Sequence, residues 1–270
     1  MSGFLEEMAV ASAARLQAAR ALRAEGALLR QAQGCAPAPR LQLQRFDLIA
    51  ELKLRSPAVG ALRGRDEDVG ARVTAYAHGG AAAVSVLTEP TRFDGALEHL
   101  ELAAQALAPL QVPAMRKDFL VDPYQVLEAR VAGAGGVLVI LRMLSAGQID
   151  AVLDCARGLG MFVLLEAFDA SDIARMHDLV QAHGAHTQLL AGINCRDLDT
   201  LQVVPPRLLE LLPLLPRQVP RVAESGVASA EDARRVAAAG YELALIGSAL
   251  MRGGDPQVLV QALLAAGRAA

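Results

Sequence analysis

Eight short apolar, β-rich segments constrain the fold of this chain more than any other feature. They lie at residues 48–51, 83–87, 112–115, 137–140, 162–165, 190–193, 221–223 and 243–246. Successive segments begin about 20 to 35 residues apart, which is the length of one strand and one crossover helix. The segments are almost continuously apolar rather than alternating, so we expect both faces of each strand to be covered.

Helix-start signals occur between these segments. Asp-Pro pairs at 122–123 and 255–256 place an N-cap carboxylate before a proline at the first helical position. Ser145 with Gln148 forms a predicted capping box. Eight consecutive βα units predict an α/β fold, a (β/α)8 TIM barrel over residues 46–270. An open doubly wound sheet is the alternative, but no GxGxxG motif follows the first segment.

Residues 1–45 are rich in alanine and arginine and precede the first predicted strand. We expect an N-terminal helical extension that packs near the barrel mouth. A transit peptide is the alternative interpretation, and Glu6, Glu7 and Glu25 argue against it because such peptides are poor in acidic residues.

Composition excludes several classes of function. The net charge is −3 and the arginines are scattered, so neither nucleic acid nor an anionic membrane is an expected partner. No apolar run approaches the ~20 residues of a membrane span. Three cysteines without a CxxC pair make a disulfide framework or a zinc site unexpected and favour a reducing cytoplasm.

Lysine occurs only at positions 53 and 117, against 24 arginines among the 26 basic residues. Both lysines follow or end predicted strands, where barrel enzymes carry their chemistry. The pKa of lysine falls readily on desolvation, and lysine, unlike arginine, can transfer a proton near neutral pH. We therefore predict that Lys53 and Lys117 act as acids or point charges. Two solvated surface lysines are the alternative.

Two carboxylates lie in the same predicted region. Glu166 directly follows the fifth segment and is a candidate general base, or else the salt-bridge partner of a lysine. Glu51 is two residues from Lys53, so both point to the same side of the strand. Glu51 either holds Lys53 in place or takes part in catalysis.

The ends of the seventh and eighth strands are predicted to bind phosphate. Ser225-Gly226 and Gly247-Ser248 lie where barrels commonly hold a phosphate on backbone N–H groups. Glycine lets the backbone approach the anion closely. The two pairs together predict a phosphorylated substrate.

The five histidines all fall in predicted helices or in the loops after them. Neither a Ser-His-Asp triad nor a His-ligated metal is therefore expected. Cys195 follows a strand end and could be a nucleophile, but no histidine lies nearby to activate it, so a packing role is favoured.

Six segments together resemble the indole-3-glycerol phosphate synthase family of tryptophan biosynthesis, from about residue 46 to 252. They are IAELKLRSP (49–57), AVSVLTEP (83–90) with FDG (93–95), MRKDFLVDPYQ (115–125), GINCRDL (192–198), VAESGV (222–227) and LIGSALM (245–251). The resemblance implies ring closure, decarboxylation and dehydration of 1-(2-carboxyphenylamino)-1-deoxyribulose 5-phosphate without cofactor or metal. It also implies a cytoplasmic enzyme, commonly monomeric, with at most weak association with other enzymes of the pathway.

The resemblance also implies a role for individual residues. Lys117 would be the general acid, Lys53 would pair with the benzoate carboxylate and could act in the dehydration, and Glu166 would be the later base. Glu51 and Asn194 would position Lys117 and the substrate hydroxyls. The implied substrate or phosphate contacts are Ser56, Phe119 (a wall of the aromatic pocket), Arg196, Glu224, Ser225, Gly226, Gly247 and Ser248.

Four places differ from the common family pattern: Ala58, Ala96, Ala167-Phe168 and Cys195. None removes a named catalytic group. Three other hypotheses stay open at this point: a Schiff-base aldolase using Lys117, the neighbouring isomerase of the same pathway, and a non-catalytic barrel that binds a phosphate ligand or a pathway partner.

Overall fold

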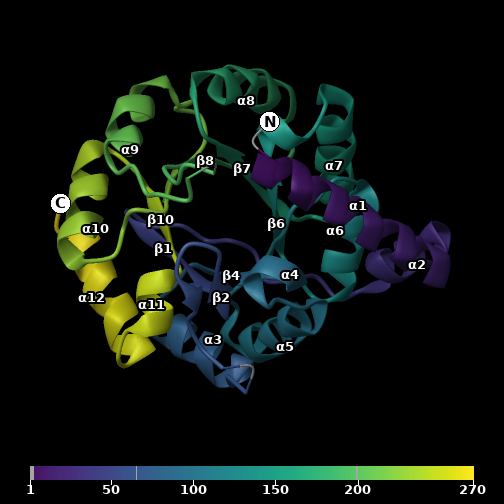
Figure 1. Cartoon of the computed structure of the whole chain (residues 1–270), viewed down its shortest axis with the longest axis horizontal. Helices are drawn as coiled ribbons and strands as arrows, with labels where there is room; N and C mark the ends of the chain where they lie inside the picture. The colour runs from purple at the N-terminus through teal and green to yellow at the C-terminus, as the bar shows by residue number, and fades with distance from the viewer. Residues whose placement is uncertain (1–2, 65, 199) are drawn as a thin grey trace.

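The computed structural model of the protein describes residues 3–64, 66–198 and 200–270 and contains a closed barrel of eight parallel strands (Figure 1). The strands are β1 (Asp47–Leu52), β4 (Ala83–Leu87), β5 (Ala114–Lys117), β6 (Gly136–Ile140), β7 (Phe162–Ala167), β8 (Leu189–Asn194), β9 (Arg221–Glu224) and β10 (Leu243–Ile246). β1 pairs with both β4 and β10, which closes the sheet. The predicted barrel is confirmed, and the open sheet is excluded.

Helices follow the strands and surround the barrel (Figure 1). They are α3 (Val69–His78), α4 (Pro90–Phe93), α5 (Leu97–Leu107), η1 (Ala108–Leu110), α6 (Pro123–Val131), η2 (Leu141–Met143), α7 (Ala146–Gly158), α8 (Ala170–His183), α9 (Pro206–Leu211), η3 (Leu212–Leu214), α10 (Ala230–Ala239), α11 (Ser248–Arg252) and α12 (Pro256–Arg268). A short hairpin of β2 (Arg55–Ser56) and β3 (Gly60–Ala61) lies in the loop after β1. Among the described residues, no helix is both long and apolar enough to span a membrane.

The predicted helix starts are confirmed. Asp122 accepts a hydrogen bond from the backbone N–H of Tyr124, and Asp255 accepts two at the start of α12. Ser145 and Gln148 form the predicted capping box at α7. These caps satisfy N–H groups that have no partner inside the helix.

Several strand ends differ from the predicted limits. β5 begins at Ala114 rather than at 112, because Pro113 has no N–H to donate to a neighbouring strand. At its other end β5 includes Lys117. In the same way β7 includes Glu166 and β9 includes Glu224. These polar residues belong to the strands and do not lie in flexible loops, so ladder hydrogen bonds fix the direction of their side chains.

The period of two along each strand divides the core into two layers. Leu48, Ala50 and Leu52 of β1 face outward and pack in the large cluster between barrel and helices. Ile49 faces inward and joins a second cluster inside the barrel, with residues such as Phe162 of β7. Nearly every strand residue is thus buried, as the continuous apolar pattern predicted.

Two helices precede the barrel, α1 (Gly3–Leu22) and α2 (Glu25–Gly34). Leu5 and Met8 of α1 belong to the same apolar cluster as the barrel interior. Leu28 of α2 packs against Tyr124 and Leu127 of α6. The helical extension thus shares its core with the barrel. Its division at residue 45 into a separate domain stays a prediction.

Gly136 of β6 gives a test of the packing inside the barrel. A Cβ added there would lie 2.4 Å from the ring of Phe162, which is 2% exposed. Gly136→Ala should lower the free energy of unfolding by about 1–3 kcal/mol through overpacking. In the control Gly147→Ala the new Cβ meets nothing within 4 Å, so stability should stay level or rise slightly. Urea denaturation measures both, and equal effects would contradict this packing.

Candidate active site

The inward-facing rows of the strands continue into polar side chains at the carboxyl ends. In β1 the inward residue Ile49 is followed two positions later by Glu51, and in β5 Met115 is followed by Lys117. The same step leads to Glu166 in β7, Asn194 in β8 and Glu224 in β9. The alternation that fills the barrel therefore also directs these groups into the barrel mouth.

A cavity of about 610 Å³ occupies the mouth. All thirteen site residues predicted from the sequence line it: Glu51, Lys53, Ser56, Lys117, Phe119, Glu166, Asn194, Arg196, Glu224, Ser225, Gly226, Gly247 and Ser248. The structure thus brings the whole predicted set together, including both lysines. The role of each residue stays a prediction.

Lys117 lies among carboxylates. Its Nζ is 3.0 Å from Glu224 Oε2 and 3.4 Å from Glu166 Oε2. Burial alone lowers the pKa of the Lys117 ammonium. The charges of Glu166, Glu224 and Glu51 outweigh burial and raise this pKa above the ordinary lysine value. Desolvation does lower the pKa of Lys117, but the neighbouring anions have the larger effect, so the site favours the charged ammonium.

Glu224 is the nearest partner of Lys117, a role that the sequence did not indicate. Its side chain is buried, and its Oε1 forms no hydrogen bond within the described part of the chain. Burial, together with the charge of Glu166, raises the pKa of Glu224 to about 8, although Lys117 acts in the opposite direction. This shift favours the protonated form of the Glu224 carboxyl near neutral pH. Gly192 leaves the space that this side chain needs, because a Cβ there would be 2.3 Å from Glu224 Oε1.

Asn194 connects two parts of the site. Its amide nitrogen donates to Glu166 Oε1 at 2.6 Å, while its Oδ1 accepts from the Ser225 hydroxyl and the Arg196 N–H, both at 2.9 Å. Asn194 was expected to position Lys117. In the structure this link is indirect: Asn194 donates a hydrogen bond to Glu166, and Glu166 contacts Lys117.

Glu51 also has a different partner from the one implied by the family resemblance. Its Oε1 pairs with the ammonium of Lys53, the neighbour on the same side of β1. Its charge acts on Lys117 without a direct hydrogen bond. Gly247 makes this pair possible, because a Cβ there would lie 2.1 Å from Glu51 Oε1 and 3.0 Å from Lys53 Nζ. This steric need by itself accounts for glycine directly after β10.

The ends of β9 and β10 form the amide-rich side of the cavity. Ser225 has a φ of 64° and Gly226 a φ of 70°, the left-handed region that an L-residue such as serine rarely adopts. Ser248 begins α11, directly after Gly247. Arg196 lines the cavity as well, and its guanidinium donates to the Leu201 carbonyl at 2.7 Å, which holds it in the loop after β8.

The opposite side of the cavity is aromatic. The Phe119 ring meets Phe4 edge-on at 5.9 Å between centroids and Phe93 at 6.2 Å. Phe168 lines the same cavity, and the Arg142 guanidinium lies 4.7 Å from its ring centroid. Only Phe119 was predicted as an aromatic wall. Phe4 was missed because it reaches the cavity from α1, whose approach no local pattern specifies.

Cys195 and the histidines take no part in this arrangement. Cys195 is fully buried in the outer core, and burial raises the pKa of its thiol to about 11. A thiol so rarely ionised is a poor nucleophile, so the packing role is confirmed. The histidines lie on helices or after them, as expected. Within the described ranges, no group of three or more His, Cys, Asp or Glu side chains is placed to hold a metal ion.

Comparison with known proteins identifies the family. The family model for indole-3-glycerol phosphate synthase matches residues 6–263. The chain belongs to this family. Curated relatives named indole-3-glycerol phosphate synthase include one from Parafrankia sp. (strain EAN1pec), 41% identical over 89% of this chain and 88% of that protein. Another, from Bordetella pertussis, is 36% identical over 98% of this chain and 100% of its own length.

Solved structures with little sequence similarity share the fold. The 3-hexulose-6-phosphate synthase from Salmonella typhimurium has a TM-score of 0.64 at 14% identity, over 83% of this chain and 99% of that chain. Thiamine phosphate pyrophosphorylase from Pyrococcus furiosus has a TM-score of 0.58 at 14% identity, over 83% of this chain and 96% of that chain. At such low identity the comparison bears on the barrel alone.

The raised pKa of Glu224 predicts a pH-dependent stability. Its carboxyl keeps a proton up to about pH 8 when folded but loses it near 4.5 when unfolded, so the folded state binds more protons between these values. The stabilisation is present below pH 4.5 and is lost as the pH rises to 8. Loss of this proton should lower the free energy of unfolding by at most about 1.4 kcal/mol per pH unit. Glu224→Gln cannot lose a proton, so its free energy of unfolding should fall less steeply with pH.

Urea titrations from pH 5 to 8.5 measure this slope. The control is Glu210→Gln, on an exposed position of α9, which should keep the wild-type slope. A Glu224→Gln variant with the same pH dependence as wild type would contradict the buried, protonated carboxyl.

Proposed function

We propose that this chain is an indole-3-glycerol phosphate synthase that converts 1-(2-carboxyphenylamino)-1-deoxyribulose 5-phosphate to indole-3-glycerol phosphate. One observation carries the proposal: both lysines of the chain meet buried carboxylates inside one cavity, between an aromatic wall and an amide-rich wall. The substrate has the same three parts. Its aromatic ring fits the wall of Phe119, its phosphate fits the ends of β9 and β10, and its reacting carbons lie between them.

Ring closure requires stabilisation of a developing alkoxide. The ring carbon that bears the carboxylate attacks the ribulose carbonyl carbon, a C–C bond forms, and the carbonyl oxygen takes the electron pair. Lys117 stabilises this oxygen and gives it a proton. Its raised pKa keeps the ammonium charged at neutral pH, so the donor is in place before the reaction begins.

Decarboxylation and dehydration complete the indole. The bond from the ring to the carboxylate breaks, carbon dioxide leaves, and its electron pair restores the aromatic ring. The new hydroxyl then leaves as water after protonation. Glu166 removes a proton from the adjacent carbon as the pyrrole double bond forms. Asn194 holds Glu166 in position for that step.

Lys53 suits the substrate carboxylate. Its Nζ lines the cavity and is partly exposed, at 13% of the side chain, with Glu51 as its partner. A single ammonium holds the carboxylate by charge alone, without the bidentate grip of an arginine, so carbon dioxide can still leave. Protonation of the departing hydroxyl is a separate step, and both lysines line the cavity in which it takes place.

The electrostatics of Lys117 argue against the Schiff-base aldolase. That mechanism needs a neutral amine as nucleophile, whereas the charge of Glu166 favours the charged ammonium. Incubation with the substrate separates the two hypotheses: indole fluorescence appears for the synthase, while a covalent lysine adduct trapped by borohydride supports the aldolase. The monomeric state, the cytoplasmic location and any association with pathway enzymes stay predictions.

Loss of the acid should reduce turnover strongly. Lys117→Ala is expected to lower kcat by about 10²–10⁴-fold. Lys117→Arg keeps a cation but cannot donate a proton at neutral pH, so its kcat should fall into the same range. Steady-state kinetics by indole fluorescence, with circular dichroism to verify folding, measures both. An arginine variant within a few-fold of wild type would show that charge alone suffices.

Loss of the base should act on the later step. Glu166→Gln keeps the shape and the hydrogen bond to Asn194 but cannot accept a proton, so kcat should fall by about 10²–10⁴-fold. The matched control is Glu98→Gln on α5, which lies outside this cavity. Near-normal turnover in Glu166→Gln would contradict its assignment as the base.

A further inference from the structure

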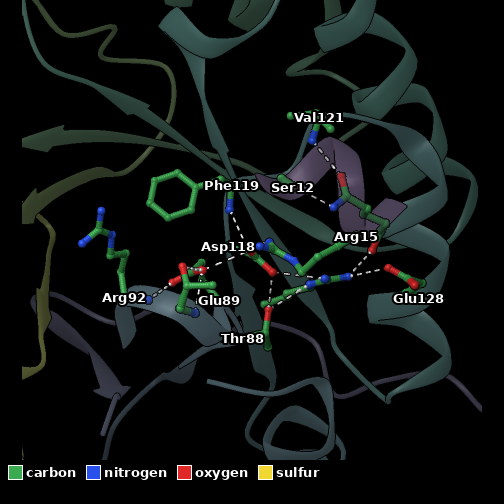
Figure 2. A network of polar contacts seen from close by, with 12 residues as sticks. Ser12, Arg15, Thr88, Glu89, Arg92, Asp118, Phe119, Val121 and Glu128 are labelled. Carbon is green, nitrogen blue, oxygen red and sulfur yellow. Dashed lines mark hydrogen bonds and ion pairs between the residues drawn. The ribbon is translucent and has the colours of Figure 1, made fainter. Parts of the chain in front are cut away.

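Asp118 directly follows Lys117 at the end of β5, and its carboxylate contacts Arg15 of α1. It is buried and accepts four hydrogen bonds (Figure 2). Oδ1 accepts from Arg15 of α1 at 2.6 Å and from the backbone N–H of Phe119 at 2.8 Å. Oδ2 accepts from the Thr88 hydroxyl at 2.7 Å and from Arg116 at 3.2 Å. One oxygen therefore connects the N-terminal helix directly to the backbone of the aromatic wall.

The same helix also carries part of that wall. Phe4, eleven positions before Arg15 in α1, packs edge-on against Phe119 and lines the cavity. Eleven residues are close to three turns of an α-helix, so Arg15 and Phe4 lie on the same side of α1. A contact of Arg15 with the loop after β5 thus fixes the helix face that presents Phe4.

A second set of contacts extends this attachment to α4. Glu89 caps α4 by accepting hydrogen bonds from the backbone N–H groups of Thr91 and Arg92. The Nη1 atom of Arg15 lies 3.7 Å from Glu89 Oε1. Arg92 of α4 in turn pairs with Glu7 of α1 at 2.5 Å. α4 ends at Phe93, the other ring packed against Phe119.

We infer that Arg15 is a positioning residue that sets the affinity of the site for the aromatic ring of its ligand. It acts through Asp118 and the placement of Phe4 against Phe119. The inference rests on the proposed function, because it assigns the aromatic end of the cavity to the carboxyphenylamino group. It predicts selectivity: weakening this contact changes binding at the aromatic end and leaves the phosphate end unchanged.

The fold should tolerate loss of Arg15. Asp118 keeps its hydrogen bonds from Thr88, Arg116 and the Phe119 N–H when Arg15 is removed. α1 keeps other attachments, such as Gln125 donating to the Ser12 hydroxyl at 2.9 Å. The variant therefore loosens one contact of α1 and leaves the helix attached.

Arg20 offers a matched control. It also joins α1 to the loop after β5, through a 2.8 Å ion pair with Asp122, and its side chain is 33% exposed against 28% for Arg15. Asp122 is the N-cap of α6 and accepts the backbone N–H of Tyr124, whereas Asp118 accepts that of Phe119. Arg15→Met and Arg20→Met thus remove similar ion pairs from the same helix, and only the first reaches the aromatic wall.

The test measures competitive inhibition of the full-length enzyme by two probes, 2-aminobenzoate for the aromatic end and inorganic phosphate for the other. Arg15→Met should raise the inhibition constant of 2-aminobenzoate about 3- to 10-fold, the range for one lost aromatic contact, and leave that of phosphate unchanged. Arg20→Met should change neither, and Arg15→Lys should recover most of the loss. In a Phe4→Ala background, Arg15→Met should have little further effect.

Several results would overturn the inference. They are equal shifts for both probes in Arg15→Met, the same shift in Arg20→Met, full additivity with Phe4→Ala, or no binding of 2-aminobenzoate to the wild-type enzyme. Turnover of the complete substrate by wild type decides the proposed function separately, so an active enzyme with unselective Arg15→Met contradicts only this inference.

Discussion

The site depends on an imbalance of charge inside a buried cavity. Glu51, Glu166 and Glu224 supply three carboxyl groups, while Lys53 and Lys117 supply two ammonium groups. Among these five groups, three anions and two cations would leave one carboxylate without an ammonium of its own, which is costly for a side chain as buried as Glu224. The site removes that cost by keeping a proton on Glu224, whose pKa is raised to about 8. Lys117 stays a charged ammonium mainly through the neighbouring charge of Glu166, beside a Glu224 carboxyl that favours its protonated form.

This arrangement follows from strand geometry. Each of these polar groups extends an inward-facing row of apolar residues by one more step of two, so the alternation that fills the barrel also directs the charged groups toward its mouth. Glycine gives the necessary space at two places, Gly192 beside Glu224 and Gly247 beside Glu51 and Lys53. A barrel with alanine at either position would have to move a charged group out of contact with its partner.

Much of the fold and the composition of the site could be predicted from sequence. Continuous apolar segments and Asp-Pro caps are local signals, and they located the strands to within two residues. The use of lysine at only two positions indicated Lys53 and Lys117. Partnerships across the barrel had no such signal. Glu224 lies 107 positions from Lys117, and Phe4 reaches Phe119 from a separate helix, so both depend on how distant elements close together.

The chain contains only two lysines. ¹⁵N NMR of their side chains can therefore follow the protonation of Lys117 and its response to Glu224 directly. A Lys53→Arg variant assigns the two Nζ signals. We expect the Lys117 nitrogen to stay an ammonium beyond pH 10 and its chemical shift to change near pH 8, when Glu224 loses its proton. A Lys117 signal that becomes neutral below the ordinary lysine pKa of about 10.4, with no step near pH 8, would contradict it.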